Sequence, residues 1–407
     1  MKNVLKFLLL VLFLFSTGLS QHSDFVGTKG EEIVLPDGTP LLLRGINLGN
    51  WLVPEGYMFK FDSATSPRFI NNVLCELVGA DEARSFWKKY RDHYITREDI
   101  LFIKKLGLNS VRIPFNWRLF TVEEYPDLWV GLGFEMLDRV IRWCKEANLW
   151  VVLDMHCAPG GQTGDNIDDS WGYPFLFENP ESQQRTIQLW QKIAERYKNE
   201  PVIIGFDLLN EPIPHFYDQS KLNPLLEPFY KRIVSAIRQV DTNHIVFLGG
   251  AQWNTNFGVF GPPFDKNVAY TFHKYWCDTT QSNIQEYVNY RSKYHVPLWM
   301  GESGENKDAW VAGWRRLQER NNIGWCFWPY KKMDSQRCLV TFDRPLHWDL
   351  LTKFAKTPHA GYISLRNTRP SIDSVRTALY EFIRLGQFKN CRLNEGYAKA
   401  LEIGSSK

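Results

Sequence analysis

The chain has 407 residues, of which 44% are hydrophobic, 23% charged and 15% aromatic, a composition typical of globular proteins. The formal net charge of +3 provides no strong field for nucleic acid or for an anionic membrane. This length fits two or three average domains, or one α/β barrel with insertions.

The first residues have the order of a secretory signal peptide. Lys2 and Lys6 flank the start of an apolar run, Phe7–Phe15, and small residues follow up to Ser20. The run is far too short to cross a bilayer, which needs about 20 residues. We therefore expect a signal peptide at residues 1–20 and a secreted (extracellular, cell-surface or periplasmic) domain at residues 21–407.

Residues 26–41, with the turn Pro36-Asp37-Gly38, predict a β-hairpin ahead of the main fold. Eight short apolar runs then predict strands, with amphipathic stretches between them. The predicted strands are Leu41–Asn47, Ser110–Pro114, Leu149–His156, Val202–Glu211, His244–Gly250, Val268–Tyr275, Pro297–Glu302 and Gly324–Tyr330.

The intervening segments predict helices. Thr96 and Asp99 have the spacing of a capping box, which marks the start of a helix that ends near Gly107. Further helices are expected at Phe134–Asn148, Ser182–Lys198, Asn223–Val240, Asn283–Tyr294, Lys307–Arg320 and Asp373–Leu385. Strands that each lead into a crossover favour an α/β fold, a single (β/α)8 TIM barrel with long βα loops. A doubly wound open sheet is the alternative, but it lacks a supported glycine-rich nucleotide turn.

The seven cysteines include no C-x-x-C pair, so a zinc ribbon or a thioredoxin-like site is not expected. Because their number is odd, at least one thiol stays free or pairs between chains. One or two disulfides are possible, with a connectivity that the spacing does not reveal.

Polar residues stand where the predicted strands end, which is the end of a TIM barrel that carries active sites. Arg112, His156, Asn210, Glu211, His273, Tyr275, Glu302 and Trp328 follow this rule. A single strand-end Glu could simply cap a helix or pair with a lysine. Two of them in apolar strands call for a function, because a buried carboxylate is costly.

These residues resemble the catalytic set of glycoside hydrolase family 5, a family of clan A retaining β-glycosidases. Phe206–Pro212 (FDLLNEP) is similar to the family's acid/base motif, and Trp299–Gly304 (WMGESG) to its nucleophile strand. Arg44–Val53 and Asp154–Gly164 are similar to the first and third strand regions of exo-β-1,3-glucanases, except that Asn50 stands where those enzymes usually have glycine.

The resemblance implies roles for individual residues. Glu302 corresponds to the nucleophile and Glu211 to the acid/base of a double displacement. Arg112 and Tyr275 would hold Glu302 ionised, Asn210 would bond the sugar 2-hydroxyl, and His156 and His273 would orient the sugar. Trp328 would stack on the sugar face.

Two long segments after predicted strands, Gly164–Phe177 and Lys331–Pro370, are expected to form loops that block one end of the site and favour attack on chain ends. Each large aromatic residue near the rim is more often core than a sugar contact. The candidates are Trp51, Trp117, Trp171, Phe175, Trp253, Trp276 and Trp348.

We therefore predict a secreted β-glucan hydrolase that acts as a monomer on β-linked oligo- or polysaccharides, with no cofactor, no catalytic metal, and no nucleic-acid or membrane partner. Alternatives are an endo-β-1,4-glucanase, a β-mannanase or a transglycosylase on the same fold. A sugar-binding barrel without activity is the non-enzymatic alternative, although such proteins usually lose one of the two glutamates.

Overall fold

The computed structural model describes residues 24–125, 127–165, 167–359 and 361–404. The predicted signal peptide at residues 1–20 lies outside these residues. In the described part of the chain, no helix has the length and apolar character needed to cross a membrane.

Eight parallel strands close into a barrel in the order β10-β3-β4-β5-β6-β7-β8-β9, which confirms the predicted TIM barrel. The strands are β3 (Arg44–Asn47), β4 (Ser110–Asn116), β5 (Trp150–Cys157), β6 (Ile203–Asp207), β7 (Ile245–Gly249), β8 (Val268–His273), β9 (Leu298–Glu302) and β10 (Gly324–Phe327). All eight predicted strands are present, but several end before the predicted limit. Asn210 and Glu211 follow β6 rather than belong to it, and Tyr275 follows β8.

Helices surround the barrel at nearly every predicted position. They are α3 (Arg97–Lys105), α4 (Leu132–Ala147), α5 (Pro180–Tyr197), α6 (Gln219–Arg238), the short α7 (Ala251–Asn254), α8 (Gln285–Tyr294) and α9 (Asp308–Arg320). The predicted capping box is confirmed, because the Asp99 carboxylate accepts a hydrogen bond from the Thr96 backbone at 2.8 Å. The hairpin of β1 (Gly27–Lys29) and β2 (Glu32–Val34) precedes the barrel, as expected.

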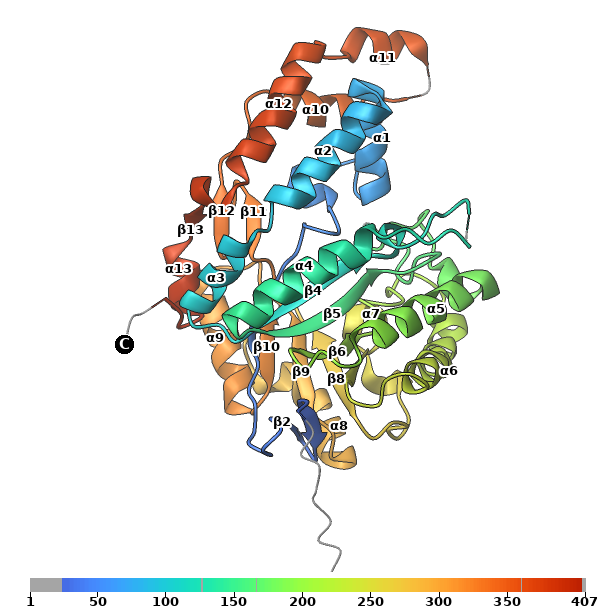
Figure 1. Ribbon diagram of the computed structural model, residues 1–407, viewed down its shortest axis with the longest axis vertical. Coiled ribbons are helices and arrows are strands. Elements are labelled where there is room, and N and C mark those ends of the chain that lie inside the picture. Colours follow the sequence, from blue (N-terminus) through green and yellow to red (C-terminus); the bar gives the residue numbers. More distant parts are fainter. Residues whose placement is uncertain (1–23, 126, 166, 360, 405–407) are drawn as a thin grey trace, which may run out of the picture.

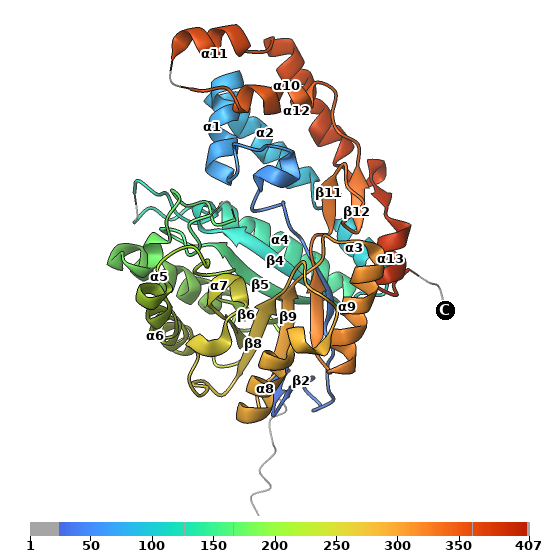
Figure 2. The same ribbon diagram turned by 180° about the vertical axis from the view of Figure 1, so that it is seen from behind.

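A helical layer at one end of the molecule brings together helices from residues 67–93 and from residues 348–385 (Figure 1). It contains α1 (Pro67–Val78), α2 (Ala80–His93), α10 (Trp348–Ala355), α11 (Tyr362–Thr368) and α12 (Ile372–Leu385). In both views α1 and α2 lie beside α10 and α12 (Figure 2), and α12 contacts α1, α2 and α10. Phe382 of α12 stacks on Phe59 with ring centroids 4.9 Å apart, so this layer has an aromatic core of its own.

The interpretation of residues 331–370 as a long irregular loop is wrong. This segment contains β11 (Lys331–Met333), β12 (Val340–Phe342), α10 and α11, and β12 pairs with β13 (Arg392–Leu393) to complete a three-stranded sheet. A last helix, α13 (Glu395–Ala400), packs against α9. Strands of two or three residues carry almost no periodic signal, so they become visible only through their partners.

Lys331 anchors this sheet to the barrel. Its ammonium pairs with Asp99 at 2.8 Å and donates to the backbone carbonyls of Tyr94 and Gly386 at 2.6 and 3.0 Å, and neither charged side chain is exposed. The Tyr330 hydroxyl also donates to Asp99, at 2.8 Å. A buried charge needs this degree of compensation.

All seven cysteines lie within the described residues and are free thiols, so the disulfides considered above are absent from this structure.

Candidate active site

Arg112 on β4 organises the interior of the barrel at the end where the strands terminate. Its guanidinium lies 3.0 Å from Asp154 on β5, 2.8 Å from Asp207 on β6 and 3.1 Å from Glu302 on β9. It also donates to the amide oxygen of Asn210, at 2.8 Å. Because parallel strands present their ends at one face of a barrel, these positions converge although they are distant in sequence.

Burial sets the charges around this guanidinium. It raises the pKa of Asp154 and of Asp207 to about 7 each, and the positive charge of Arg112 only partly opposes that rise. Burial disfavours the charged form of Arg112, but Asp154, Asp207 and Glu302 together raise its pKa. Arg112 therefore stays a cation, with its fixed charge 3.1 Å from the Glu302 carboxylate.

Glu302, the predicted nucleophile, is the last residue of β9 and is bonded through both oxygens. Oε2 accepts from Arg112 at 3.1 Å, and Oε1 accepts from the Tyr275 hydroxyl at 2.7 Å. Burial raises the pKa of Glu302, while the Arg112 charge and the Tyr275 hydrogen bond act in the opposite direction. These two partners favour the ionised form that a nucleophile requires.

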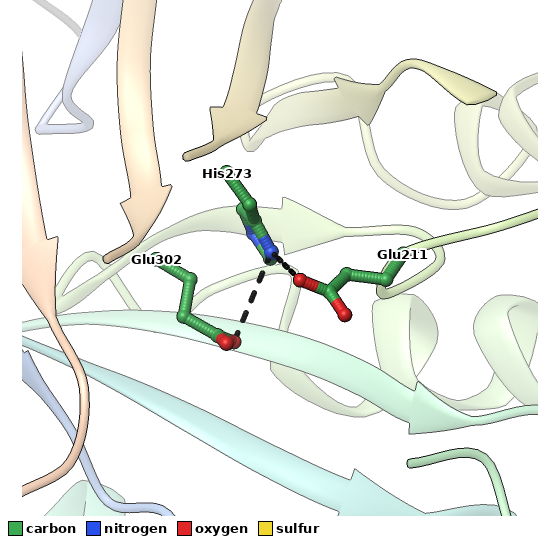
Figure 3. A group of neighbouring side chains, drawn as sticks. All are labelled: Glu211, His273 and Glu302. Carbon is green, nitrogen blue, oxygen red and sulfur yellow. Dashed lines mark hydrogen bonds and ion pairs between the residues drawn. The ribbon is translucent and has the colours of Figure 1, made fainter. Parts of the chain in front are cut away.

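Glu211, the predicted acid/base, follows β6 with a backbone φ of 47°, in the left-handed region that side chains other than glycine seldom adopt. Its carboxyl oxygen lies 2.8 Å from Nδ1 of His273 (Figure 3). Burial and the nearby charge of Glu302 raise the pKa of Glu211 well above its usual range. This is the direction that keeps a general acid protonated.

The two carboxyl groups face one another across a short gap. Single donor atoms of Glu211, His273 and Glu302 all lie within 4.8 Å of one another, and Figure 3 shows both glutamates pointing toward the histidine. Such a group could in principle hold a cation. However, Glu302 is already bonded by Arg112 and Tyr275, and Glu211 by His273, so protein donors occupy part of each carboxyl. That no metal takes part stays an expectation.

The two histidines are neutral and fixed. Burial lowers the pKa of His156 to about 3 and, together with the charge of Arg112, lowers that of His273 well below its usual range. His156 bonds Asp154 at 2.8 Å and lies 3.4 Å from the Asn210 amide nitrogen. Its ring is stacked on Trp328, with centroids 5.4 Å apart and planes at 4°.

All eight predicted site residues are therefore linked to one another by direct contacts. The prediction missed a second group on the rim, which comes from the turn η1 (Gly56–Phe59) and from segments after β9 and β10. The hydroxyl of Tyr57 accepts from Trp328 Nε1 at 2.8 Å and donates to Glu305 at 3.0 Å. Lys332 pairs with Glu305 and lies 4.2 Å from the centre of the Tyr57 ring.

Glu55 is the other residue that the prediction missed. Its carboxyl is buried, lies 3.7 Å from His156, and has one oxygen without a hydrogen-bond partner in the described structure. Burial and the charges of Glu302 and Glu305 raise its pKa well above its usual range. Asn50 positions it: with φ of 61°, its side chain accepts from the Glu55 backbone at 3.0 Å. A substitution of glycine by asparagine is tolerated there because asparagine adopts this conformation readily.

The aromatic candidates fall into two groups. Trp51, Trp117 and Trp348 are buried, as expected for most of the large aromatic residues, and none of them has a hydrogen bond or ring contact with the eight residues of the predicted site in the described structure. Trp171, Phe175 and Trp276 are exposed, and Trp253 is half-buried, so these four remain available to a ligand.

Comparison with known proteins shows the family of this chain. Residues 75–334 match the family model described as Cellulase (glycosyl hydrolase family 5). The Beta-xylosidase of Phanerodontia chrysosporium is 34% identical over 290 residues, which are 70% of this chain and 59% of that protein. Endoglucanase C of Acetivibrio thermocellus is 28% identical over 311 residues, 61% of this chain and 88% of that protein.

The Probable glucan 1,3-beta-glucosidase A of Aspergillus fumigatus is 32% identical over 212 residues, 51% of this chain and 49% of that protein. This chain thus spans only about half of the glucosidase and three fifths of the xylosidase. Among solved structures, an endogalactoceramidase aligns with a TM-score of 0.61 and 20% identity over 93% of this chain and 84% of that one. AoRut aligns with a TM-score of 0.58 and 16% identity over 72% and 89%. At these identities the two structures show a shared fold.

Proposed function

This chain belongs to glycosyl hydrolase family 5, and on that premise we propose that it is a retaining β-glycosidase that releases sugars from the ends of β-linked glucans. The observation that carries the proposal is that one carboxyl oxygen of Glu211 lies within 4.8 Å of one carboxyl oxygen of Glu302. Retaining enzymes place their carboxyl groups about 5–5.5 Å apart, whereas inverting enzymes need about 6.5–9.5 Å for an intervening water.

The two glutamates would act in sequence. An oxygen of Glu302 attacks the anomeric carbon while Glu211 gives its proton to the departing glycosidic oxygen, so the glycosidic bond breaks as a glycosyl ester forms. Glu211, now ionised, takes a proton from a water that attacks the same carbon and releases Glu302. Arg112 and Tyr275 favour the ionised form of Glu302, whereas the negative charge of Glu302 favours the protonated form of Glu211. These effects support Glu302 as the nucleophile and Glu211 as the acid.

The neighbouring residues would bind the sugar. Arg112 fixes the amide of Asn210, which suits a hydrogen bond to the 2-hydroxyl. The indole of Trp328, backed by the stacked ring of His156, offers a flat apolar face to a pyranose ring.

Side chains around Trp328 support attack on the ends of glucan chains. Tyr57, Glu305 and Lys332 connect η1 to the segments after β9 and β10, and Tyr57 holds the indole nitrogen of Trp328. A connected group of side chains beside Trp328, the proposed stacking residue, would favour binding of the end of a glucan chain over binding of its middle. Similarity to a protein named glucan 1,3-beta-glucosidase agrees with this choice, while similarity to an endoglucanase keeps internal cleavage as the alternative.

We also propose that residues 1–20 direct export, because their charged, apolar and small-residue order is that of a signal peptide. N-terminal sequencing of the exported protein should begin close to Gln21.

The proposal is tested by NMR of the first minutes of hydrolysis, in which the released sugar should be the β-anomer. An initial α-anomer would refute the double displacement. Laminarin, pustulan, lichenan, cello-oligosaccharides and mannan should be compared as substrates. Early glucose from laminarin supports attack on chain ends, and an early ladder of oligosaccharides contradicts it.

A further inference from the structure

A cavity of about 190 Å³ lies where α1 and α2 meet the segments after β3, β4 and β5. Trp51, Asn72, Arg91 and Arg118 are among its lining residues, and none of the eight predicted site residues lines it. It nevertheless opens near the same end of the barrel. Asn116, which lines it, is the last residue of β4, the strand that carries Arg112. Pro54, which also lines it, adjoins Glu55.

The lining of this cavity has an excess of positive charge. It contains three arginines, Arg68, Arg91 and Arg118, and one carboxylate, Asp169. Both oxygens of that carboxylate are engaged: one accepts from the Arg68 backbone at 2.7 Å and the other from the Asn116 amide at 3.0 Å. Asp169 also lies 3.6 Å from Nε of Arg68 and 3.8 Å from Nε of Arg118, and Glu123 pairs with both of these arginines. Among the described residues, the positive charge that no carboxylate pairs with is therefore that of Arg91.

Two of the arginines keep unused hydrogen-bond donors. Arg68 is 94% buried in its side chain, and it pairs with Glu123 at 3.3 Å, but its Nη1 has no hydrogen-bond partner among the described residues. Arg91 pairs with no carboxylate in the described structure, and its Nε is buried without a partner. A buried donor without a partner is costly. Arg139, Arg185 and Arg291 also have a buried Nε without a hydrogen-bond partner among the described residues, but this cavity has two arginines with such donors in one lining.

The rest of the lining suits a sugar. Asn71 and Asn72 bring amide groups to the cavity, and Trp51, Trp87 and Tyr90 bring aromatic surface. The exposed ring of Trp171 lies 3.8 Å from the Arg68 guanidinium, in a cation–π contact. Amides bond hydroxyl groups, aromatic rings pack on pyranose faces, and a guanidinium fork matches a carboxylate.

We propose that this cavity binds a uronic acid, a sugar bearing a carboxylate, on the glycan that the neighbouring site cleaves. The inference rests on the proposed function for its setting, and it extends that function from neutral glucans to glycans with acidic sugars. The carboxylate would take the unused donors of Arg68 and Arg91, and the ring and hydroxyl groups would meet the aromatic and amide lining.

Calorimetric titration with methyl β-D-glucuronide and methyl β-D-glucoside tests the proposal, because these probes differ in one carboxylate. We expect the glucuronide to bind at least tenfold more tightly than the glucoside. Arg91→Gln should weaken glucuronide binding at least tenfold. Arg384→Gln, which removes an exposed arginine on α12 paired only locally with Glu381, should not.

A second variant distinguishes a loss of binding from a loss of folding. Asn72→Trp adds bulk at an exposed rim position without removing a buried charge, and it should also abolish glucuronide binding. Equal affinity for the two glycosides, glucuronide binding that survives both cavity variants, or inorganic phosphate bound as tightly as the glucuronide would each overturn the proposal. Because the titration involves no turnover, a protein that hydrolyses laminarin but ignores the glucuronide refutes only this inference. One that binds the glucuronide but hydrolyses no glucan refutes only the proposed function.

Discussion

Replacing Tyr275 by phenylalanine should shift the pH dependence of catalysis with little change in the fold. The substitution removes one hydrogen bond, the 2.7 Å contact from the tyrosine hydroxyl to the Glu302 carboxylate, and keeps the ring. A hydrogen bond to a charged group contributes about 1.5–3 kcal/mol. One pKa unit corresponds to about 1.36 kcal/mol, so the pKa of Glu302 should change by roughly one to two units.

The sign follows from which form the hydroxyl stabilises. Tyr275 donates to the ionised carboxylate and so holds the pKa of Glu302 down, against the effect of burial. Without this bond the pKa rises, and the acid limb of kcat/KM should move to higher pH by about one to two units. The alkaline limb should move less, because it depends on Glu211, which is bonded by His273 rather than by Tyr275.

The assay is the pH profile of kcat/KM on an aryl β-glycoside that the wild type cleaves. Tyr290→Phe is a matched control, since its hydroxyl donates to the Gly261 carbonyl at 2.9 Å and it is not among the residues of the predicted site. An acid limb that stays within about 0.3 units of the wild type in Tyr275→Phe, or that moves equally in Tyr290→Phe, would refute the role assigned to Tyr275.

Three further predictions concern the chemistry and the stability of the chain. Glu302→Gln and Glu211→Gln should each lower turnover by about three orders of magnitude or more, and azide should partly restore Glu302→Gly; near-normal rates in either glutamine variant would contradict the assignment. Lys331→Met should lower the free energy of unfolding by about 3–5 kcal/mol, because it leaves Asp99 buried without its cation. Urea unfolding measures this loss, with the exposed Lys389→Met as the control expected to stay within about 0.5 kcal/mol. Thiol titration of the unfolded, unreduced protein should find all seven cysteines, and the folded protein should react slowly at Cys144, Cys157 and Cys326, where burial raises the thiol pKa; a count below seven would indicate a disulfide.

The barrel and the eight candidate residues followed from local patterns in the sequence. Apolar runs of strand length alternate with amphipathic segments, and polar residues stand at the strand ends. Once the strands are assumed parallel, their ends must gather at one face, so Arg112, Glu211 and Glu302 are expected to meet without any knowledge of distances.

Other features had no local signal. Glu55 lies in an irregular turn, and its importance appears only because that turn brings it beside His156. The strands β11, β12 and β13 are too short to show a period, and they exist because they pair with one another. Likewise, α1 and α2 form one layer with α10 and α12 only because the fold brings residues 67–93 against residues 348–385.

The sequence by itself determined the fold class and indicated the candidate residues of the site, because hydrophobic periodicity and the position of polar residues at strand ends are properties of neighbouring residues. The tertiary structure alone decided the state of those residues. Burial raises the pKa of Glu302, and Arg112 and Tyr275 oppose that rise, whereas burial and the charge of Glu302 both raise the pKa of Glu211. The arginine-lined cavity likewise needs α1, α2 and three barrel loops together. Charge, burial and enclosure depend on distances between segments far apart in the chain, and no window of sequence contains them.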